Sequence, residues 1–179
     1  EAVRRRDPAA LEAFFERYFD EIYGLVYRLL GERPAAEDMA QEVFLKVHRA
    51  VEHIDPSRDP KPWLTAIAYN ACRDHWRSGA YRMGRRSDSI DDDPALGERL
   101  PGAAPDPERE ALAGERSRLV LAAIRQLPEN LRVPVVLHDY QGLSHAEIGA
   151  MLGIEHAAAR KRYSRALEAL GALLREKLG

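Results

Sequence analysis

Aromatic rings and cations alternate along one stretch of the sequence, between residues 69 and 86. Duplex DNA needs mainly cations and hydrogen-bond donors, whereas rings among the cations suit unpaired bases, which stack on the rings while the cations follow the phosphates. The pattern therefore indicates binding to single-stranded nucleic acid. The alternative for the rings, and for Trp76 in particular, is a place in the hydrophobic core. The residues of the pattern are Tyr69, Asn70, Arg73, Trp76, Arg77, Tyr81, Arg82, Arg85 and Arg86.

A second group of cations belongs to a helix-turn-helix pattern near the end of the chain. Ser144 and Glu147 have the spacing of a capping box, and Gly153 ends the short helix that this box begins. The next helix carries cations near its start, where a major groove can receive them. The alternative is an αα-hairpin with a solvated basic face. The cations are Arg160, Lys161, Arg162 and Arg165, and the stripe expected to pack inward is Ala159, Tyr163, Ala166, Leu167 and Leu170.

A third pattern is polar but not basic. Asp38, Gln41, Glu42 and Leu45 follow at i, i+3, i+4 and i+7, so they share one face of a helix. A purely solvated face, the alternative, would more often carry pairs of Lys and Glu. A mixture of acids, an amide and a leucine suits a partner protein. The opposite stripe, expected to be buried, is Ala36, Met39, Val43 and Val47.

Helices are the elements that must position these residues, and no strand is predicted. An aspartate N-cap and a following proline begin the first helix at Asp7, and Gly31 ends it. Pro34 begins the second helix and Pro62 the third, whereas Pro134 falls inside a predicted helix and is expected to kink it. The helices of the second half are predicted at residues 112–127, 128–138, 144–152 and 155–177. Apolar stripes are expected at Leu11, Phe14, Tyr18, Ile22, Leu25 and Leu29, and at Leu64, Ile67, Ala68 and Ala71.

An acidic segment separates the two halves. The net charge is +1 over residues 1–87, −6 over residues 88–113 and +3 over residues 114–179. The middle is rich in proline and glycine and has no apolar repeat, so residues 87–110 are predicted to be a flexible linker. Its run Asp91-Asp92-Asp93 is interpreted as solvated rather than as a metal site. The predicted fold is all-α, with two small helical bundles at 1–86 and 111–179.

Composition and missing motifs argue against a secreted, a membrane-spanning and an enzymatic protein. The single cysteine, Cys72, cannot form an internal disulfide and is expected in the core of a protein from a reducing cytoplasm. No stretch is long and apolar enough for membrane insertion, and the first residues lack the apolar core of a secretory signal. No metal-binding, nucleotide-binding or catalytic motif is present, so we expect no enzyme activity, no catalytic residues, no cofactor and no metal.

Two stretches together resemble the extracytoplasmic-function branch of the sigma-70 family of transcription initiation factors. AAEDMAQEVFLKVHRAVEHIDPSRDPKPWLTAIAYNACRDHWR is similar to sigma region two, and LPENLRVPVVLHDYQGLSHAEIGAMLGI with its following helix is similar to region four. The resemblance covers nearly the whole chain, and the two motifs occur in the family's order. It implies a sigma region two domain at 1–86 for polymerase binding, −10 recognition and melting, and a region four domain at 111–179 for −35 recognition.

The resemblance also implies three binding surfaces. Asp38, Gln41, Glu42 and Leu45 would dock on the clamp helices of core RNA polymerase. The −35 element, as duplex DNA, would be read by Arg160, Lys161, Arg162, Ser164 and Arg165. The single-stranded −10 element would be captured by Asp55, Ser57, Arg58, Lys61, Tyr69, Asn70, Arg73, Trp76 and Arg77.

The implied function is promoter-directed transcription initiation in the cytoplasm, and an anti-sigma factor is an expected partner. The alternative is a helix-turn-helix regulator that never joins polymerase, although it leaves both the aromatic and cationic stretch from Tyr69 and the polar face around Glu42 unexplained. The sequence departs from the family at His48, where tryptophan is usual, and at Glu155-His156-Ala157-Ala158-Ala159, which lacks a hydroxyl N-cap. Base contacts by residues 156–159 are therefore not predicted.

Overall fold

The computed structural model describes residues 1–78 and 107–178, with side chains described over residues 1–78 and 114–177. Within these residues every regular element is a helix, which confirms the predicted all-α fold. The chain divides into two compact units, unit 1 at Glu1–Ser89 and unit 2 at Ile90–Gly179. The predicted linker at 87–110 lies mostly outside the described residues, so its flexibility and the domain boundaries remain predictions.

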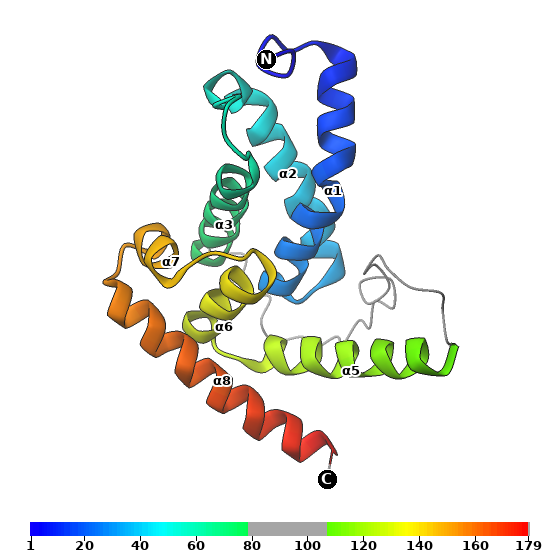
Figure 1. Cartoon of the computed structure of the whole chain (residues 1–179), viewed down its shortest axis with the longest axis vertical. Helices are drawn as coiled ribbons and strands as arrows, with labels where there is room; N and C mark the ends of the chain where they lie inside the picture. Colours follow the sequence, from blue (N-terminus) through cyan, green and yellow to red (C-terminus); the bar gives the residue numbers. More distant parts are fainter. Residues whose placement is uncertain (79–106, 179) are drawn as a thin grey trace. The chain divides into compact units, whose positions relative to one another are not determined.

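Unit 1 is a bundle of three helices, each of which contacts the other two (Figure 1). Asp7 caps the first helix by accepting a 2.9 Å hydrogen bond from the Ala10 amide, and Gly31 ends it in the left-handed conformation. Both were predicted from the sequence and are confirmed. Its helices are α1 (Pro8–Leu30), α2 (Arg33–Ala50) and α3 (Lys61–Arg77), with a short 3-10 turn, η1 (Val51–His53), after α2.

The core of unit 1 follows most of the predicted stripes, although Phe14, Tyr18 and Ile67 are only half-buried. Ala36, Met39, Val43 and Val47 of α2 are all at most 5% exposed. Leu25 and Leu29 of α1 are fully buried, and Leu64, Ala68 and Ala71 of α3 pack in the same core. Each fully buried large aliphatic side chain contributes about 1.5–3 kcal/mol relative to an exposed one. Cys72 is also fully buried, and burial, followed by the charge of Glu42, raises the pKa of its thiol to about 12.

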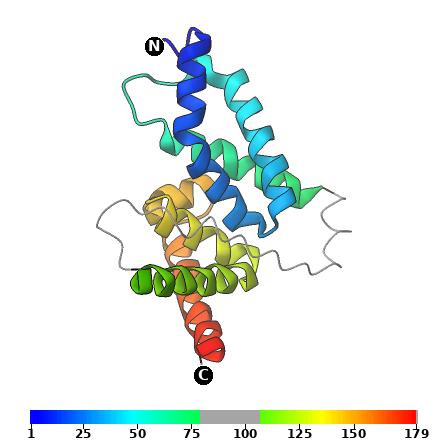
Figure 2. The same cartoon turned by 90° about the vertical axis from the view of Figure 1, so that its right-hand side faces the viewer.

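Unit 2 packs its other helices against one long helix, which runs to the C-terminal end (Figures 1 and 2). The predicted helix at 128–138 changes character after Pro134, since two residues later the chain widens into a π-helical turn. Proline has no amide hydrogen, so it breaks the regular ladder at that point. The elements of unit 2 are α5 (Pro107–Gln126), α6 (Glu129–Val135), η3 (Val136–Tyr140), α7 (His145–Leu152) and α8 (His156–Leu178).

A buried arginine closes the junction between α5 and α6. Arg132 is only 7% exposed. Its guanidinium donates to the carbonyl oxygens of Arg125 and Leu127, at 2.8 and 2.9 Å. These two carbonyls lie at the end of α5 and directly after it, so Arg132 caps the C-terminal end of that helix. Within the described residues, no helix combines the length and the apolar character needed to cross a membrane.

Candidate functional site

The predicted polar face of α2 is exposed. Asp38, Gln41 and Glu42 lie on the surface, and Leu45 is 59% exposed although it is apolar. Glu42 forms a 2.9 Å ion pair with Lys46 one turn later. Because the opposite stripe of α2 is fully packed against α1 and α3, this face is the part of the helix available to a partner.

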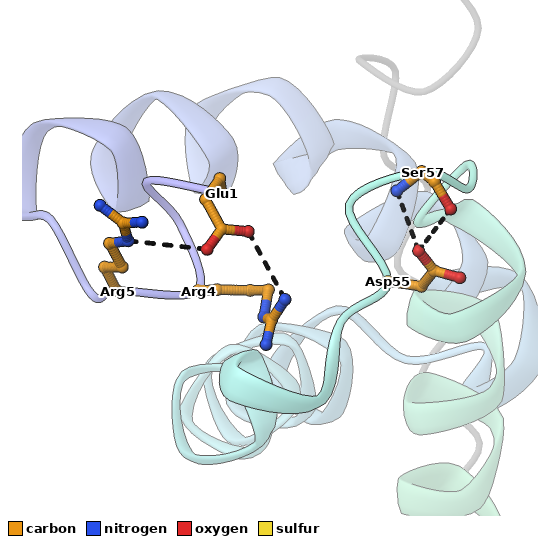
Figure 3. A network of polar contacts seen from close by, with 5 residues as sticks. All are labelled: Glu1, Arg4, Arg5, Asp55 and Ser57. Atoms are coloured by element: carbon orange, nitrogen blue, oxygen red, sulfur yellow. Dashed lines mark hydrogen bonds and ion pairs between the residues drawn. The ribbon is translucent and has the colours of Figure 1, made fainter.

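The loop between η1 and α3 is held by its own side chains. Oδ1 of Asp55 accepts hydrogen bonds from the Ser57 hydroxyl at 2.6 Å and from the Ser57 amide at 2.9 Å (Figure 3). These bonds, with smaller contributions from the charges of Arg58 and Arg4, hold the pKa of the Asp55 carboxyl below its ordinary value of 3.8. At the other end of the loop, Oδ1 of Asp59 accepts from the Lys61 amide at 3.0 Å. The loop therefore presents an ordered surface.

The predicted strand-binding residues of this loop differ in exposure. Asp55, Ser57 and Arg58 are exposed, whereas Lys61 is half-buried. The ammonium of Lys61 lies 2.7 Å from Oε1 of Glu21 on α1. Lys61 therefore ties the start of α3 to α1, and a DNA contact would have to compete with that ion pair.

The predicted outer face of α3 is partly wrong. Tyr69 and Trp76 are each only 7% exposed, so their rings lie in the core and are not presented for stacking on bases. They continue a buried stripe with Thr65 and Cys72, at spacings of four, three and four. Because α3 packs against both α1 and α2, its buried face is wider than a single stripe.

The true outer stripe of α3 consists of Asn70, Asp74 and Arg77, all exposed. Arg73 lies beside it, half-buried, with its Nε atom 3.9 Å from Oδ1 of Asp74. The structure thus supports two of the predicted polar residues, Asn70 and Arg77, as surface groups and adds Asp74 to them. Tyr81, Arg82, Arg85 and Arg86, the rest of the predicted aromatic and cationic stretch, lie outside the described residues.

The helix-turn-helix geometry of unit 2 is confirmed. The Ser144 hydroxyl accepts from the Glu147 amide, and Oε2 of Glu147 accepts from the Ser144 amide at 2.8 Å, so both halves of the capping box are formed. Gly153 adopts the left-handed conformation at the turn, with φ 66°. A Cβ on Gly149 would lie 2.8 Å from the carbonyl oxygen of Ile154, so this glycine permits the close approach of the two helices.

The cationic face of α8 is exposed as predicted. Arg160, Lys161 and Arg165 lie on the surface, together with Ser164, whose hydroxyl donates to the Arg160 carbonyl at 3.1 Å. Arg162 is half-buried. The predicted inward stripe holds at Ala159, Ala166 and Leu170 but is wrong at Leu167, which is 44% exposed. Leu167 comes directly after Ala166, so the helix turns it about 100° away from the buried face.

A cluster of rings supports the start of α8 and was not predicted. The rings of His138 and His145 stack with centroids 4.6 Å apart, and Tyr163 meets the His138 ring edge-on at 4.6 Å. Nδ1 of His138 donates to the Leu143 carbonyl at 2.7 Å. These residues come from three elements, η3, α7 and α8, and Tyr163 follows His145 by 18 positions, so no spacing within one helix could have identified the cluster.

An arginine turn at the start of the chain was also missed. The backbone of residues 1–7 folds back on itself, and Arg6 occupies the left-handed region, with φ 59°. Nη2 of Arg6 donates to the Arg49 carbonyl at 3.3 Å and lies 3.7 Å from Oε2 of Glu52. These contacts hold the turn against the end of α2 and η1. Three consecutive arginines were the only signal in the sequence.

Comparison with known proteins assigns both units. Residues 14–82 match the family described as Sigma-70 region 2, and residues 117–170 match the one described as Sigma-70, region 4. The RNA polymerase sigma-H factor of Pseudomonas aeruginosa is 32% identical, over 99% of this chain and 93% of its own length. The ECF RNA polymerase sigma factor SigE of Mycolicibacterium smegmatis is 35% identical over 92% of this chain, which spans 62% of that relative's length.

A solved structure agrees on the fold. The sigma factor RpoE of Bartonella quintana, in a co-crystal with the anti-sigma factor NepR, matches with a TM-score of 0.66 at 19% identity, over 92% of this chain and 96% of that one. With both regions present, in order, and with the Pseudomonas aeruginosa relative matched over 93% of its length, the chain belongs to the extracytoplasmic-function branch of the sigma-70 family.

Proposed function

We propose that this sigma factor, which directs RNA polymerase to promoters, does so through three surfaces on its two units. The exposed face of α2 binds core polymerase. The loop around Asp55 and the outer stripe of α3 capture the unpaired −10 strand in the cytoplasm, where polymerase acts. The cationic face of α8 enters the major groove of the −35 element. We propose no catalytic role for any of them.

The polymerase-binding proposal rests on the contrast between the two faces of α2. The buried stripe of α2 is complete. Its opposite face carries Asp38 and Gln41, and among these polar residues Leu45 is apolar and 59% exposed. Scattered apolar residues are common on surfaces, but one surrounded by acids and an amide fits the edge of a protein interface. A regulator that only binds DNA gives no reason for such a face, so this observation supports the proposal.

The strand-capture proposal rests on an ordered loop next to an exposed polar stripe. The Asp55 carboxylate is held by Ser57, which fixes the loop, and Asn70 and Arg77 are exposed on α3. Asn70 can pair with the edges of an unstacked base, and Arg77 can contact phosphate. With Tyr69 and Trp76 buried, base recognition is assigned to hydrogen bonds rather than to stacking on those two rings.

The −35 proposal rests on cations at the start of a helix that is braced from behind. Arg160 and Arg165 project from the exposed side of α8, whereas Ala159 and Ala166 pack into unit 2. Arginine in a major groove can pair with both acceptors of a guanine. An anti-sigma factor is a further proposed partner, supported by the similar fold of the Bartonella quintana complex.

Binding of core polymerase tests the proposal. Glu42→Arg reverses a charge in the centre of the exposed face and is expected to weaken capture of core polymerase at least tenfold while leaving the fold intact. The matched control is Glu12→Arg, which makes the same charge change at an exposed position of α1, outside this face. Equal capture by both variants would remove this face of α2 from the interface.

A further inference from the structure

The arginine turn lies directly beside the loop that is proposed to capture the −10 strand. Arg4 is near enough to Asp55 for its charge to lower the pKa of that carboxyl. Figure 3 shows Arg4 between the Glu1 carboxylate and the segment that carries Asp55 and Ser57. Arg4 and Asp55, which are 51 positions apart in the sequence, are thus neighbours in space, at one end of the helical bundle.

The turn is fixed in place rather than trailing from the bundle. The amides of Arg5, Arg6 and Asp7 donate to the carbonyls of Glu1, Val3 and Ala2, at 3.2, 3.0 and 3.2 Å. Arg6 holds the turn to the Arg49 carbonyl of α2 and to Glu52 of η1. A non-glycine residue with φ 59° is uncommon and persists only where its surroundings hold it. The side chains of Arg4 and Arg5 therefore project from a defined place.

Arg4 and Arg5 share one acid. Nη1 of Arg4 and Nε of Arg5 lie 3.5 and 3.6 Å from the two oxygens of Glu1, and the Arg5 side chain is 77% exposed. Exposed ion pairs of this length are weak and are readily exchanged. Two guanidinium groups against one carboxylate leave a positive charge, which Arg58 in the neighbouring loop increases. A guanidinium group can bind a phosphate through two parallel hydrogen bonds, whereas each of these groups makes one long contact to Glu1.

We infer that Arg4 and Arg5 extend the strand-binding surface, by contacting backbone phosphates of the non-template strand whose bases the Asp55 loop and α3 receive. The inference rests on the proposed strand capture and adds a phosphate clamp to it. The loop needs such a partner, because its own Asp55 and Asp59 bring negative charge close to the path of the strand. The Glu1 carboxylate occupies the guanidinium groups until a phosphate displaces it.

The test uses holoenzyme assembled from core polymerase and the full chain, on a promoter recovered by transcription of a genomic fragment library. The −10 segment is held open by mismatches, so that melting does not limit binding. Each phosphate contact on a single strand contributes about 0.7 to the slope of log affinity against log salt concentration. Arg4→Ala/Arg5→Ala is expected to lower that slope by about 1.4 and to weaken binding roughly tenfold near 0.15 M salt.

The matched control is Arg17→Ala/Arg33→Ala, which removes the same charge from exposed positions elsewhere on α1 and α2. It is expected to leave the slope nearly unchanged. Glu1→Gln is expected to tighten binding, since the competing carboxylate is gone. A slope for Arg4→Ala/Arg5→Ala equal to that of the control, or weaker binding by Glu1→Gln, would overturn the inference.

Two further measurements distinguish failure of the phosphate clamp from failure of strand capture. Asn70→Ala and Arg77→Ala test the strand capture on which the inference rests. If they weaken binding while Arg4→Ala/Arg5→Ala does not, the phosphate clamp is wrong and strand capture stands; if none of them does, both are wrong. Capture of core polymerase without DNA is measured for the same variants. A loss there by Arg4→Ala/Arg5→Ala would assign the turn to a polymerase contact instead.

Discussion

The hydroxyl of Tyr163 on α8 donates a 2.8 Å hydrogen bond to Oδ1 of Asp139 in η3. The bond joins the proposed recognition helix to the π-helical turn that follows Pro134. Burial of the hydroxyl, followed by this bond and the Asp139 charge, raises the pKa of Tyr163 above its ordinary value of 10.0, so the phenol stays protonated as a donor. Tyr163 thus has a positioning role behind the cationic face.

Removing that hydroxyl is expected to loosen unit 2 slightly. Tyr163→Phe should lower the free energy of unfolding of unit 2 by about 0.5–1.5 kcal/mol, the usual net contribution of one hydrogen bond. Both tryptophans, Trp63 and Trp76, belong to unit 1, so unit 2 is followed by NMR signals of its own residues. A double-mutant cycle with Asp139→Ala isolates the pair. A coupling energy of zero would show that the two side chains do not support each other.

The stacked histidines make the stability of unit 2 sensitive to acid. Burial of the ring, followed by the charges of His138, His156 and Arg160, lowers the pKa of His145 below its ordinary value of 6.5, and Asp139 only partly opposes this. Nδ1 of His145 is itself buried without a hydrogen-bond partner. The neighbours from η3 and α8 therefore favour the neutral ring in the folded state.

The sign of the pH effect follows from that shift. At pH values between the lowered pKa of the folded state and 6.5, His145 binds more protons in the unfolded chain than in the folded one. Its contribution to the free energy of unfolding is therefore complete above pH 6.5 and is lost as the pH falls through the folded-state pKa. The free energy of unfolding of unit 2 should decrease from about pH 7.5 to about pH 5, and less so in His145→Gln. NMR titration of the ring giving a pKa at or above 6.5 would contradict this account.

Trp76 is expected to support the fold of unit 1 rather than to contact bases. Trp76→Ala removes a ring that is 7% exposed, which typically costs about 3–5 kcal/mol. Trp63 remains as the fluorescent reporter of unfolding in denaturant. The exposed Asn70→Ala is the control and should change stability by less than about 0.5 kcal/mol. Wild-type stability in Trp76→Ala, combined with loss of strand binding, would instead place this ring against DNA.

Sequence preference at the −35 element is expected to depend on the exposed cations of α8. If Arg160 or Arg165 pairs with a guanine, its change to alanine costs about 1–3 kcal/mol and relaxes the preference at one position. Arg162→Ala should weaken all sequences alike and lower the salt slope by about one. Arg175→Ala, exposed near the other end of α8, is the control. Unchanged preference in both Arg160→Ala and Arg165→Ala would mean that another face of α8 meets the groove.

The features that the sequence predicted correctly are mostly local. The Asp7 cap, the Gly31 end and the Ser144–Glu147 capping box depend on residues within four positions of each other, and all three form as expected. The cationic face of α8 was also predictable, because the spacing of residues along one helix is enough to show which of them share a face.

The features that the sequence missed depend on contacts between distant segments. Whether Tyr69 faces solvent depends on how many helices pack against α3. Both α1 and α2 pack against α3, and Tyr69 is buried. The bond from Tyr163 to Asp139 spans 24 positions in the chain. The place of Arg4 beside Asp55 depends on a left-handed turn at Arg6, which nothing in its residue type predicts.

Transcription by purified core polymerase, with and without this protein, tests the central claim most directly. On closed duplex templates from the genomic library, discrete start sites are expected only when the protein is present. Asn70→Ala and Arg77→Ala should reduce those transcripts, and a template whose −10 segment is already open should recover part of the loss. If the protein binds the duplex tightly yet core polymerase starts at the same places without it, the chain is a DNA-binding regulator and not an initiation factor.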